Sequence, residues 1–146
     1  MTTQEIVSVE ALDRATCWTL VGRQSVGRVA MLRRRRPMIL PVTYVVDGET
    51  IIYRTAEGST LVPFGSAEDM AFEIDGVDEE RQLGWSVLVV GRATIMRDQP
   101  EIERKAAGLE PWAPGDRSVF VALRADEVSG RQVVRTRGQR LVTSEP

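Results

Sequence analysis

The sequence predicts a mainly β fold, a small closed antiparallel barrel of about six strands with flanking helices. Apolar or alternating runs of strand length follow one another with short turns between them. Closure into a barrel removes the sheet edges that a chain rich in valine and isoleucine would otherwise expose. The second and third runs have no crossover helix between them, which disfavours a doubly wound parallel sheet.

The N-terminal half is predicted to begin with a loose terminus over residues 1–7, followed by a helix over about residues 9–22. Ser8 is the expected N-cap of this helix, because a serine hydroxyl can accept from the first free amides. Asp47-Gly48 favours a two-residue hairpin turn between the second and third strands. The three strands expected in this half cover residues 26–32, 38–46 and 50–55.

The C-terminal half is predicted to contain three more strands and a short helix. Gly91 lies in the middle of the longest run and indicates a bulge or a bend there. The expected elements are a short helix or turn over 59–65, a strand over 70–74, an acidic loop over 75–84, a strand over 85–96, a helix from Pro100 to Gly108, a strand over 119–124 and its continuation over 128–134. The predicted domain organisation is therefore a flexible N-terminus over 1–7, a barrel domain over 8–134 and a tail over 135–146.

Composition excludes several kinds of catalysis. The chain has no histidine, which removes Ser-His-Asp and Cys-His catalysis, histidine-ligated haem and most zinc chemistry. Cys17 is the only cysteine, so intrachain disulfides and a thiolate metal cage are excluded, and no metal site is predicted. Lys105 is the only lysine, so Schiff-base chemistry would depend on one residue. If the protein carries out chemistry, a bound cofactor is expected to supply it.

Charge and hydropathy point away from nucleic acid and from membranes. The chain has 19 basic and 21 acidic residues, and a net charge of -2 argues against a dedicated nucleic-acid binder. No apolar run approaches the roughly 20 residues that cross a bilayer. Residues 1–25 lack the apolar block and cleavage site of a signal peptide, so a cytoplasmic location is expected.

Four strings of residues carry a family resemblance: Gly27-Arg28-Val29-Ala30, Pro41-Val42-Thr43-Tyr44-Val45-Val46-Asp47-Gly48, Ile52-Tyr53-Arg54-Thr55-Ala56-Glu57-Gly58 and Gly84-Trp85-Ser86-Val87-Leu88-Val89-Val90-Gly91-Arg92-Ala93. In their order and spacing they resemble the pyridoxamine 5′-phosphate oxidase-like family, in its actinobacterial flavin/deazaflavin oxidoreductase branch. The resemblance covers about residues 8 to 134. It implies a six-stranded antiparallel split β-barrel, the FMN-binding split barrel, that forms a homodimer.

The resemblance also implies a cofactor and the residues that hold it. Members of the family place FMN, or in related branches a deazaflavin coenzyme, in a groove at the dimer interface. The ring lies against the second strand, the phosphate at the end of the third strand and the following turn, and the start of the fifth strand flanks the ring. The corresponding residues are Pro41, Val42, Thr43 and Tyr44, then Arg54, Thr55, Ser59 and Thr60, then Trp85 and Ser86.

The expected phosphate site has the right chemistry but lacks one cation. An arginine fork, hydroxyls and free amides are the donors that a phosphate needs. The same residues also fit an ordinary strand end with an exposed Arg54 and a capping Ser59. Flavin-binding members usually carry lysine or arginine where this chain has Thr60. The missing charged hydrogen bond is worth roughly 1.5–3 kcal/mol, about one or two orders of magnitude in affinity.

The function predicted from this resemblance is a flavin- or deazaflavin-dependent oxidoreductase that transfers hydride to a small substrate. No catalytic side chain is assigned, although Tyr44 and Tyr53 are the only phenols and candidate proton donors. The alternative is a non-catalytic barrel that has lost tight flavin binding and carries another ligand or none.

Two further features each have two interpretations. The arginine run 33–36 can contact a polyanion or form a solvated turn, and the solvated turn is the simpler reading. Trp112, between two prolines, can pack its own loop or close over a ligand, and packing is the simpler reading.

Overall fold

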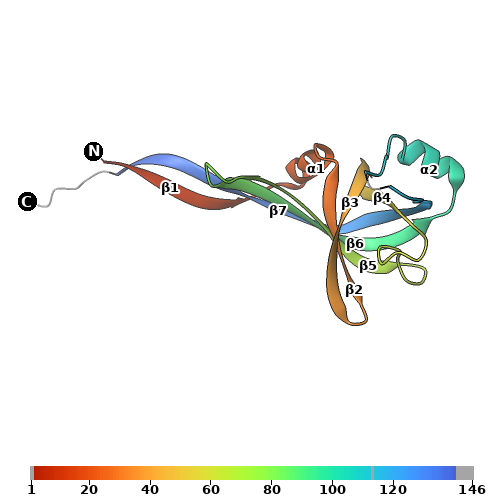
Figure 1. Cartoon of the computed structure of the whole chain (residues 1–146). Helices are drawn as coiled ribbons and strands as arrows, with labels where there is room; N and C mark the ends of the chain where they lie inside the picture. Colours follow the sequence, from red (N-terminus) through yellow and green to blue (C-terminus); the bar gives the residue numbers. More distant parts are fainter. Residues whose placement is uncertain (1, 113, 141–146) are drawn as a thin grey trace, which may run out of the picture.

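The computed structural model describes residues 2–112 and 114–140, and its central feature is a closed ring of six antiparallel strands (Figure 1). The ring order is β7-β4-β3-β2-β5-β6, and pairing of β6 with β7 closes it. The strands are β2 (Val26–Arg33), β3 (Arg36–Asp47), β4 (Thr50–Thr55), β5 (Glu68–Asp78), β6 (Leu83–Met96) and β7 (Val119–Arg140). The predicted fold class, a six-stranded split barrel, is confirmed.

Side chains that alternate along these strands fill the barrel. Tyr53 and Phe72 are fully buried, and Phe72 meets Tyr44 edge to face with ring centroids 4.8 Å apart. A side chain at Gly27 would collide with the Phe72 ring, so a glycine is required opposite it on β2. Full burial of an aromatic ring is worth roughly 1.5–3 kcal/mol, and the barrel therefore has a dense core of its own.

The predicted bulge at Gly91 is confirmed. The β6–β7 register shifts between Val90 and Gly91, because Val90 pairs with Glu127 and Gly91 with Ala125. Asp126 is the extra residue on β7, and a side chain at Gly91 would overlap the Arg124 backbone. The bulge bends β7 without ending it, so the segments 119–124 and 128–134, expected as a strand and its continuation, form one uninterrupted strand.

Two short helices lie beside the barrel: α1 (Arg14–Gly22) and α2 (Gln99–Lys105). The predicted start of the first helix at residue 9, with Ser8 as its cap, is wrong. Asp13 is the N-cap, and its Oδ1 accepts from Thr16 N at 2.8 Å, because the residues before it are paired as a strand. The second predicted helix is confirmed, although it ends before Gly108. The segment 59–65 forms turns rather than a helix.

An arm, two-stranded beyond its base, extends from the barrel at the end opposite α2, and the β5–β6 hairpin lies alongside β7 at its base (Figure 1). It consists of β1 (Thr2–Ala11) paired antiparallel with Arg131–Arg140 of β7. The expected loose N-terminus 1–7 and the expected tail from residue 135 are therefore wrong for residues 2–7 and 135–140. Position 1 and positions 141–146 lie outside the described residues. Each strand of the arm is stabilised by a partner more than 100 positions away, which a local pattern cannot reveal.

Candidate functional site

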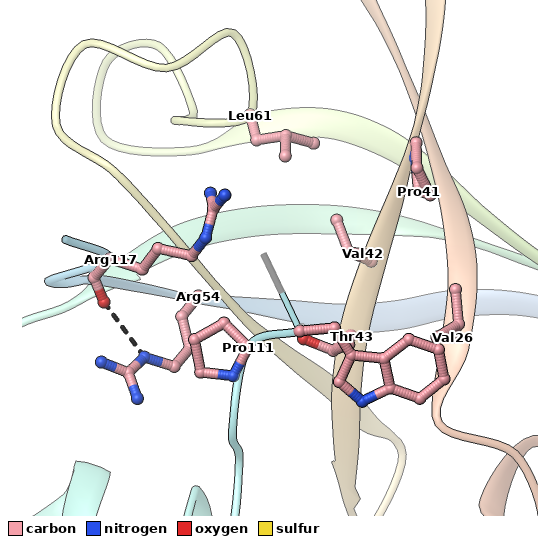
Figure 2. A pocket seen from close by; sticks show the side chains of 9 residues that line it. Val26, Pro41, Val42, Thr43, Arg54, Leu61, Pro111 and Arg117 are labelled. Carbon is pink, nitrogen blue, oxygen red and sulfur yellow. Dashed lines mark hydrogen bonds between the residues drawn. The ribbon is translucent and has the colours of Figure 1, made fainter. Parts of the chain in front are cut away.

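The candidate site is a cleft beside β3, with a cavity volume of about 220 Å³ (Figure 2). It lies where β3, β4 and the loop before β7 approach one another. Its lining residues are Val26, Pro41, Val42, Thr43, Arg54, Leu61, Pro111, Trp112 and Arg117. Four of these, Pro41, Val42, Thr43 and Arg54, are residues that the sequence analysis placed at a cofactor.

One wall of the cleft is an edge of β3 that has no strand neighbour in the described part of the chain. Along one edge, Arg36 to Thr43 pair with β2. Along the other edge, β4 pairs with β3 only from Tyr44 onward, and the last two residues of β4, Arg54 and Thr55, pair with β7 alone. An unpaired strand edge presents backbone N–H and C=O groups that seek partners. At this edge Pro41 can offer only its carbonyl, since proline has no N–H, whereas Thr43 can offer both its N–H and its C=O to a ligand.

The opposite side of the cleft carries two guanidinium groups, those of Arg54 and Arg117. Arg54 Nε donates to the Arg117 carbonyl at 3.0 Å, and its Nη1 donates to the Leu109 carbonyl at 3.2 Å (Figure 2). The Arg54 guanidinium also lies 4.8 Å from the centroid of the Phe120 ring. Within residues 2–112 and 114–140, neither arginine forms an ion pair with a carboxylate. The cleft is consequently positive and suited to an anionic ligand.

Trp112 also lines the cleft, and its side chain is 76% exposed. The interpretation that it packs its own loop is therefore wrong. Pro111, which is half-buried, restricts the backbone just before it. An exposed indole beside a cationic cleft provides a flat apolar surface against which an aromatic ring can stack.

Of the ten residues predicted to bind the cofactor, four line this cleft and six do not. Thr55 is fully buried, and its Oγ1 has no hydrogen-bond partner within the described residues. Ser59 and Thr60 line a second cavity, of about 640 Å³, on the far side of the loop that carries Leu61. Trp85 and Ser86 line a third cavity, of about 370 Å³, at the base of the arm. A single chain thus does not bring all ten residues together.

Tyr44 is the sixth of these residues, and it lies inside the barrel. Its hydroxyl donates to the Val21 carbonyl at 2.5 Å, and the Tyr53 hydroxyl donates to the Leu61 carbonyl at 2.8 Å. Burial raises the pKa of both phenols above the ordinary value. Neither tyrosine lines the cleft, so the structure does not support them as proton donors to a ligand there.

Sequence reasoning did not place Arg117, Pro111 or Leu61 at the site. No motif marks these residues, since they come from loops that the barrel brings against β3. The described residues contain no group of three or more histidine, cysteine, aspartate or glutamate side chains that could hold a metal ion. In the same part of the chain, no helix is long and apolar enough to cross a membrane.

Comparison with known proteins gives consistent results. The family described as "Pyridoxamine 5'-phosphate oxidase" matches residues 13–132. An uncharacterized protein of Mycobacterium tuberculosis is 33% identical over 136 residues, covering 90% of each chain. A solved structure of a conserved Corynebacterium diphtheriae protein of unknown function is 34% identical, covers 86% of this chain and 98% of its own, and has a TM-score of 0.71. A solved FAD-binding protein from Mycobacterium smegmatis is 26% identical, with coverages of 86% and 98% and a TM-score of 0.66.

Proposed function

The chain belongs to the pyridoxamine 5′-phosphate oxidase-like family, and on this basis we propose that it binds a flavin nucleotide in the cleft beside β3 and transfers hydride to a small substrate. The FAD-binding relative from M. smegmatis supports a flavin as the ligand class. FMN is the form proposed for this site, with a deazaflavin coenzyme as the alternative.

The observation that carries this proposal is the unpaired edge of β3, where the Pro41 carbonyl and the Thr43 N–H and C=O are free. The pyrimidine end of a flavin ring has alternating N–H and C=O groups, which match the free backbone groups of a strand edge. Ligand pockets that enclose a drug-sized molecule usually measure about 300–1,000 Å³, and this cleft measures about 220 Å³. It is therefore suited to the ring, while the ribityl phosphate would extend beyond it.

The phosphate would follow the loop after β4. Leu61 lines the ring cleft, and its neighbours Ser59 and Thr60 line the adjoining cavity, so this loop separates the two spaces. A ribityl phosphate that leaves the cleft past Leu61 would meet the hydroxyls of Ser59 and Thr60. The Arg54 guanidinium would lie on the side of the cleft. Thr55, by contrast, would contribute through the backbone at the strand end, because its side chain is enclosed.

The residues of this chain would bind and orient the ring rather than move protons. The charged side chains that line the cleft are those of Arg54 and Arg117, and its described lining includes no carboxylate, thiol or phenol. A bound flavin supplies the hydride chemistry itself. Trp112 would cover one ring face and exclude water, and the β3 backbone would fix the position of the ring edge.

We further propose that the working form is a homodimer joined through the arm. Val9, Val133, Gly84 and Val77 lie directly opposite one another across β1, β7, β6 and β5, so they form one row on one face of the sheet. Val9 and Val77 are 64% and 69% exposed. Gly84 leaves a gap between the valines of the row, and this gap can accept a side chain from a second copy. In a symmetric contact the row of each copy packs on the row of the other, so both are buried together.

A second copy of the chain would also give Trp85 and Ser86 a place at a flavin, although they lie away from the cleft of their own chain. Both line the cavity at the base of the arm, next to the exposed valine row. Trp85 lies against Gly76, where a side chain would collide with the indole. In the proposed dimer these two residues would approach the ring cleft of the partner.

The alternative function is a non-catalytic barrel with weak flavin affinity. Two features favour this alternative. Thr60 stands where flavin-binding members usually have a lysine or arginine. In addition, Arg54 Nε and Nη1 already donate hydrogen bonds to the backbone carbonyls of Arg117 and Leu109, which leaves fewer donors for a phosphate. The two functions differ in flavin affinity and in turnover.

The test is a visible spectrum of the purified protein, followed by titration with FMN and with a deazaflavin coenzyme. Micromolar binding, with oxidation of a reduced nicotinamide, supports the oxidoreductase. Thr60→Lys should tighten FMN binding by about tenfold or more, since a charged hydrogen bond is worth roughly 1.5–3 kcal/mol. Thr19→Lys, on the exposed face of α1, adds the same charge elsewhere and is the control. A colourless protein that binds neither ligand would overturn the proposal.

A further inference from the structure

A second cavity, which we call the arginine pocket, lies between the β2–β3 turn and the loop after β4. It measures about 640 Å³ and adjoins the proposed flavin cleft along the same strand. Met38 lines the arginine pocket and Val42 lines the cleft, and four residues of strand span about 13 Å. Its lining includes Arg33, Arg34, Arg36, Ser59, Thr60 and Phe64.

The turn at this pocket has an unusual sequence for its backbone. Arg34 and Arg35 have φ values of 53° and 64°, which is the left-handed region at both central positions of a two-residue hairpin. Asn-Gly is the favoured sequence for such a turn, because other side chains are strained there. Arginine is thus present despite a conformational cost, which indicates that the side chains serve a purpose beyond forming the turn.

Arg33 builds the wall of the pocket and is not free to bind a ligand. Its side chain is 10% exposed, and its Nη1 lies 2.6 Å from Glu68 Oε2. Nε donates to the Thr60 carbonyl and Nη2 to the Val62 carbonyl, both at 3.0 Å. The interpretation of 33–36 as one solvated turn is therefore wrong for Arg33, which fastens the loop after β4 to the hairpin.

Arg34 and Arg36 supply the charge of the pocket. Both are exposed, both line the cavity, and neither forms an ion pair with any described carboxylate. The Ser59 hydroxyl accepts from Leu61 N at 3.1 Å, which leaves its proton available to a ligand. Two arginine forks and a hydroxyl donor are a set of groups that suits phosphate oxygens.

Phe64 gives the pocket an aromatic surface. Its side chain is 63% exposed, and one ring face lies under the Arg33 guanidinium at 4.2 Å from the centroid. The Arg33 contact orients the ring and leaves the opposite face open. An exposed, oriented aromatic face stacks well on a nucleobase.

We propose that the arginine pocket binds a nucleoside diphosphate, with the phosphates on Arg34 and Arg36 and the base on Phe64. The ligand is either a free nucleotide such as ADP or the ADP half of a dinucleotide flavin. The second source rests on the proposed flavin site, since it requires the ring to lie in the adjoining cleft. The first source does not depend on flavin binding.

The experiment is isothermal titration calorimetry of the full chain with ADP, adenosine, FMN and FAD. The test variant is Arg34→Asn combined with Arg36→Gln, because asparagine suits the left-handed turn and keeps the hairpin intact. Arg35→Asn removes the same charge from the same turn at a residue that does not line the cavity, and it is the matched control.

The expected result is that ADP binds more tightly than adenosine and that the double variant weakens ADP at least tenfold. FMN affinity should fall by a smaller factor than ADP affinity, because the FMN ring is held in the cleft and only its phosphate is proposed to lie at Ser59 and Thr60. The control should resemble the wild type. FAD that binds tighter than FMN, with the difference lost in the double variant, identifies the dinucleotide as the source. A third result is that ADP binds only when the arginines are present and FMN does not bind at all. This result supports the arginine pocket as a site for a free nucleotide, and it overturns the flavin proposal.

Three outcomes would overturn the inference. ADP could fail to bind the wild type, or it could bind the double variant equally well. A short single-stranded RNA could displace ADP with an affinity that falls steeply with salt, which would indicate a polyanion surface instead of a nucleotide pocket. In each case FMN binding, measured on the same samples, reports on the flavin cleft separately.

Discussion

The barrel and the arm differ in how their apolar side chains are covered. In the barrel, every strand has two strand neighbours, and residues such as Phe72 and Val87 are fully buried. In the arm, β1 pairs with β7 alone, and Ile6, Val7 and Val9 are 50%, 54% and 64% exposed. The barrel can therefore be stabilised by one chain, whereas the arm leaves apolar surface exposed on a single chain, which the proposed dimer would cover.

The largest expected effect comes from truncating a side chain in the barrel core. Phe72→Ala should lower the free energy of unfolding by about 3–5 kcal/mol, because it removes buried contacts and leaves a cavity. Ile6→Ala, the matched truncation in the arm, should change the free energy of unfolding by less than about 0.5 kcal/mol. Denaturant unfolding of both variants measures the difference. Similar losses for the two variants would contradict the distinction between barrel and arm.

An intermediate effect on the free energy of unfolding is expected from removing the hydroxyl of a tyrosine buried in the barrel. Tyr53→Phe removes the hydrogen bond to the Leu61 carbonyl and should cost about 1–3 kcal/mol, since that carbonyl stays buried. Burial raises the pKa of Tyr44 and Tyr53 above their ordinary value of 10.0. The folded state thus holds both phenolic protons more tightly than the unfolded state does.

The sign of the pH dependence follows from that difference. Stability from the two phenols is complete below the ordinary pKa near 10.0 and is lost as pH rises above it. Phenolate absorbance should therefore increase together with unfolding in one alkaline transition. Tyr53→Phe should make the dependence on alkaline pH shallower. Ionisation of both tyrosines in a still-folded protein would contradict this account.

The smallest effect on the stability of a single chain is expected in the arm. Val9→Asp should leave the free energy of unfolding of the monomer within about 0.5 kcal/mol, but it should abolish the proposed dimer by placing a charge in the valine row. Ile6→Asp lies on the opposite face of the arm and is the control. Analytical ultracentrifugation checks both variants. A wild type that sediments as a monomer would overturn the proposed interface.

Local patterns were sufficient to predict the barrel but not the arm. The hairpin at Asp47-Gly48, the bulge at Gly91 and the strand over 50–55 follow from short-range signals and are confirmed. The strand β1 was missed because its partner, Arg131–Arg140, is distant in the sequence. The prediction of Ser8 as the helix cap is wrong because residues up to Ala11 pair as a strand with β7, which moves the start of the helix to Arg14 with Asp13 as its N-cap.

The candidate site was predictable to a similar extent. The family resemblance identified Pro41–Thr43 and Arg54, which the structure brings into one cleft. Arg117 and the exposure of Trp112 depend on where the loop before β7 folds, which no motif indicates. Ser59 and Thr60 follow Arg54 closely in sequence, yet the turn after β4 places them in the arginine pocket.

The central claim is that a flavin ring lies against the unpaired edge of β3. The most direct test is the dissociation constant of FMN for Thr43→Trp, which fills the cleft, compared with Ile39→Trp, which adds the same bulk at an exposed position of the same strand. We predict that Thr43→Trp weakens FMN binding by at least about tenfold, or 1.4 kcal/mol, while Ile39→Trp binds like the wild type. Equal affinity in all three proteins would contradict the claim.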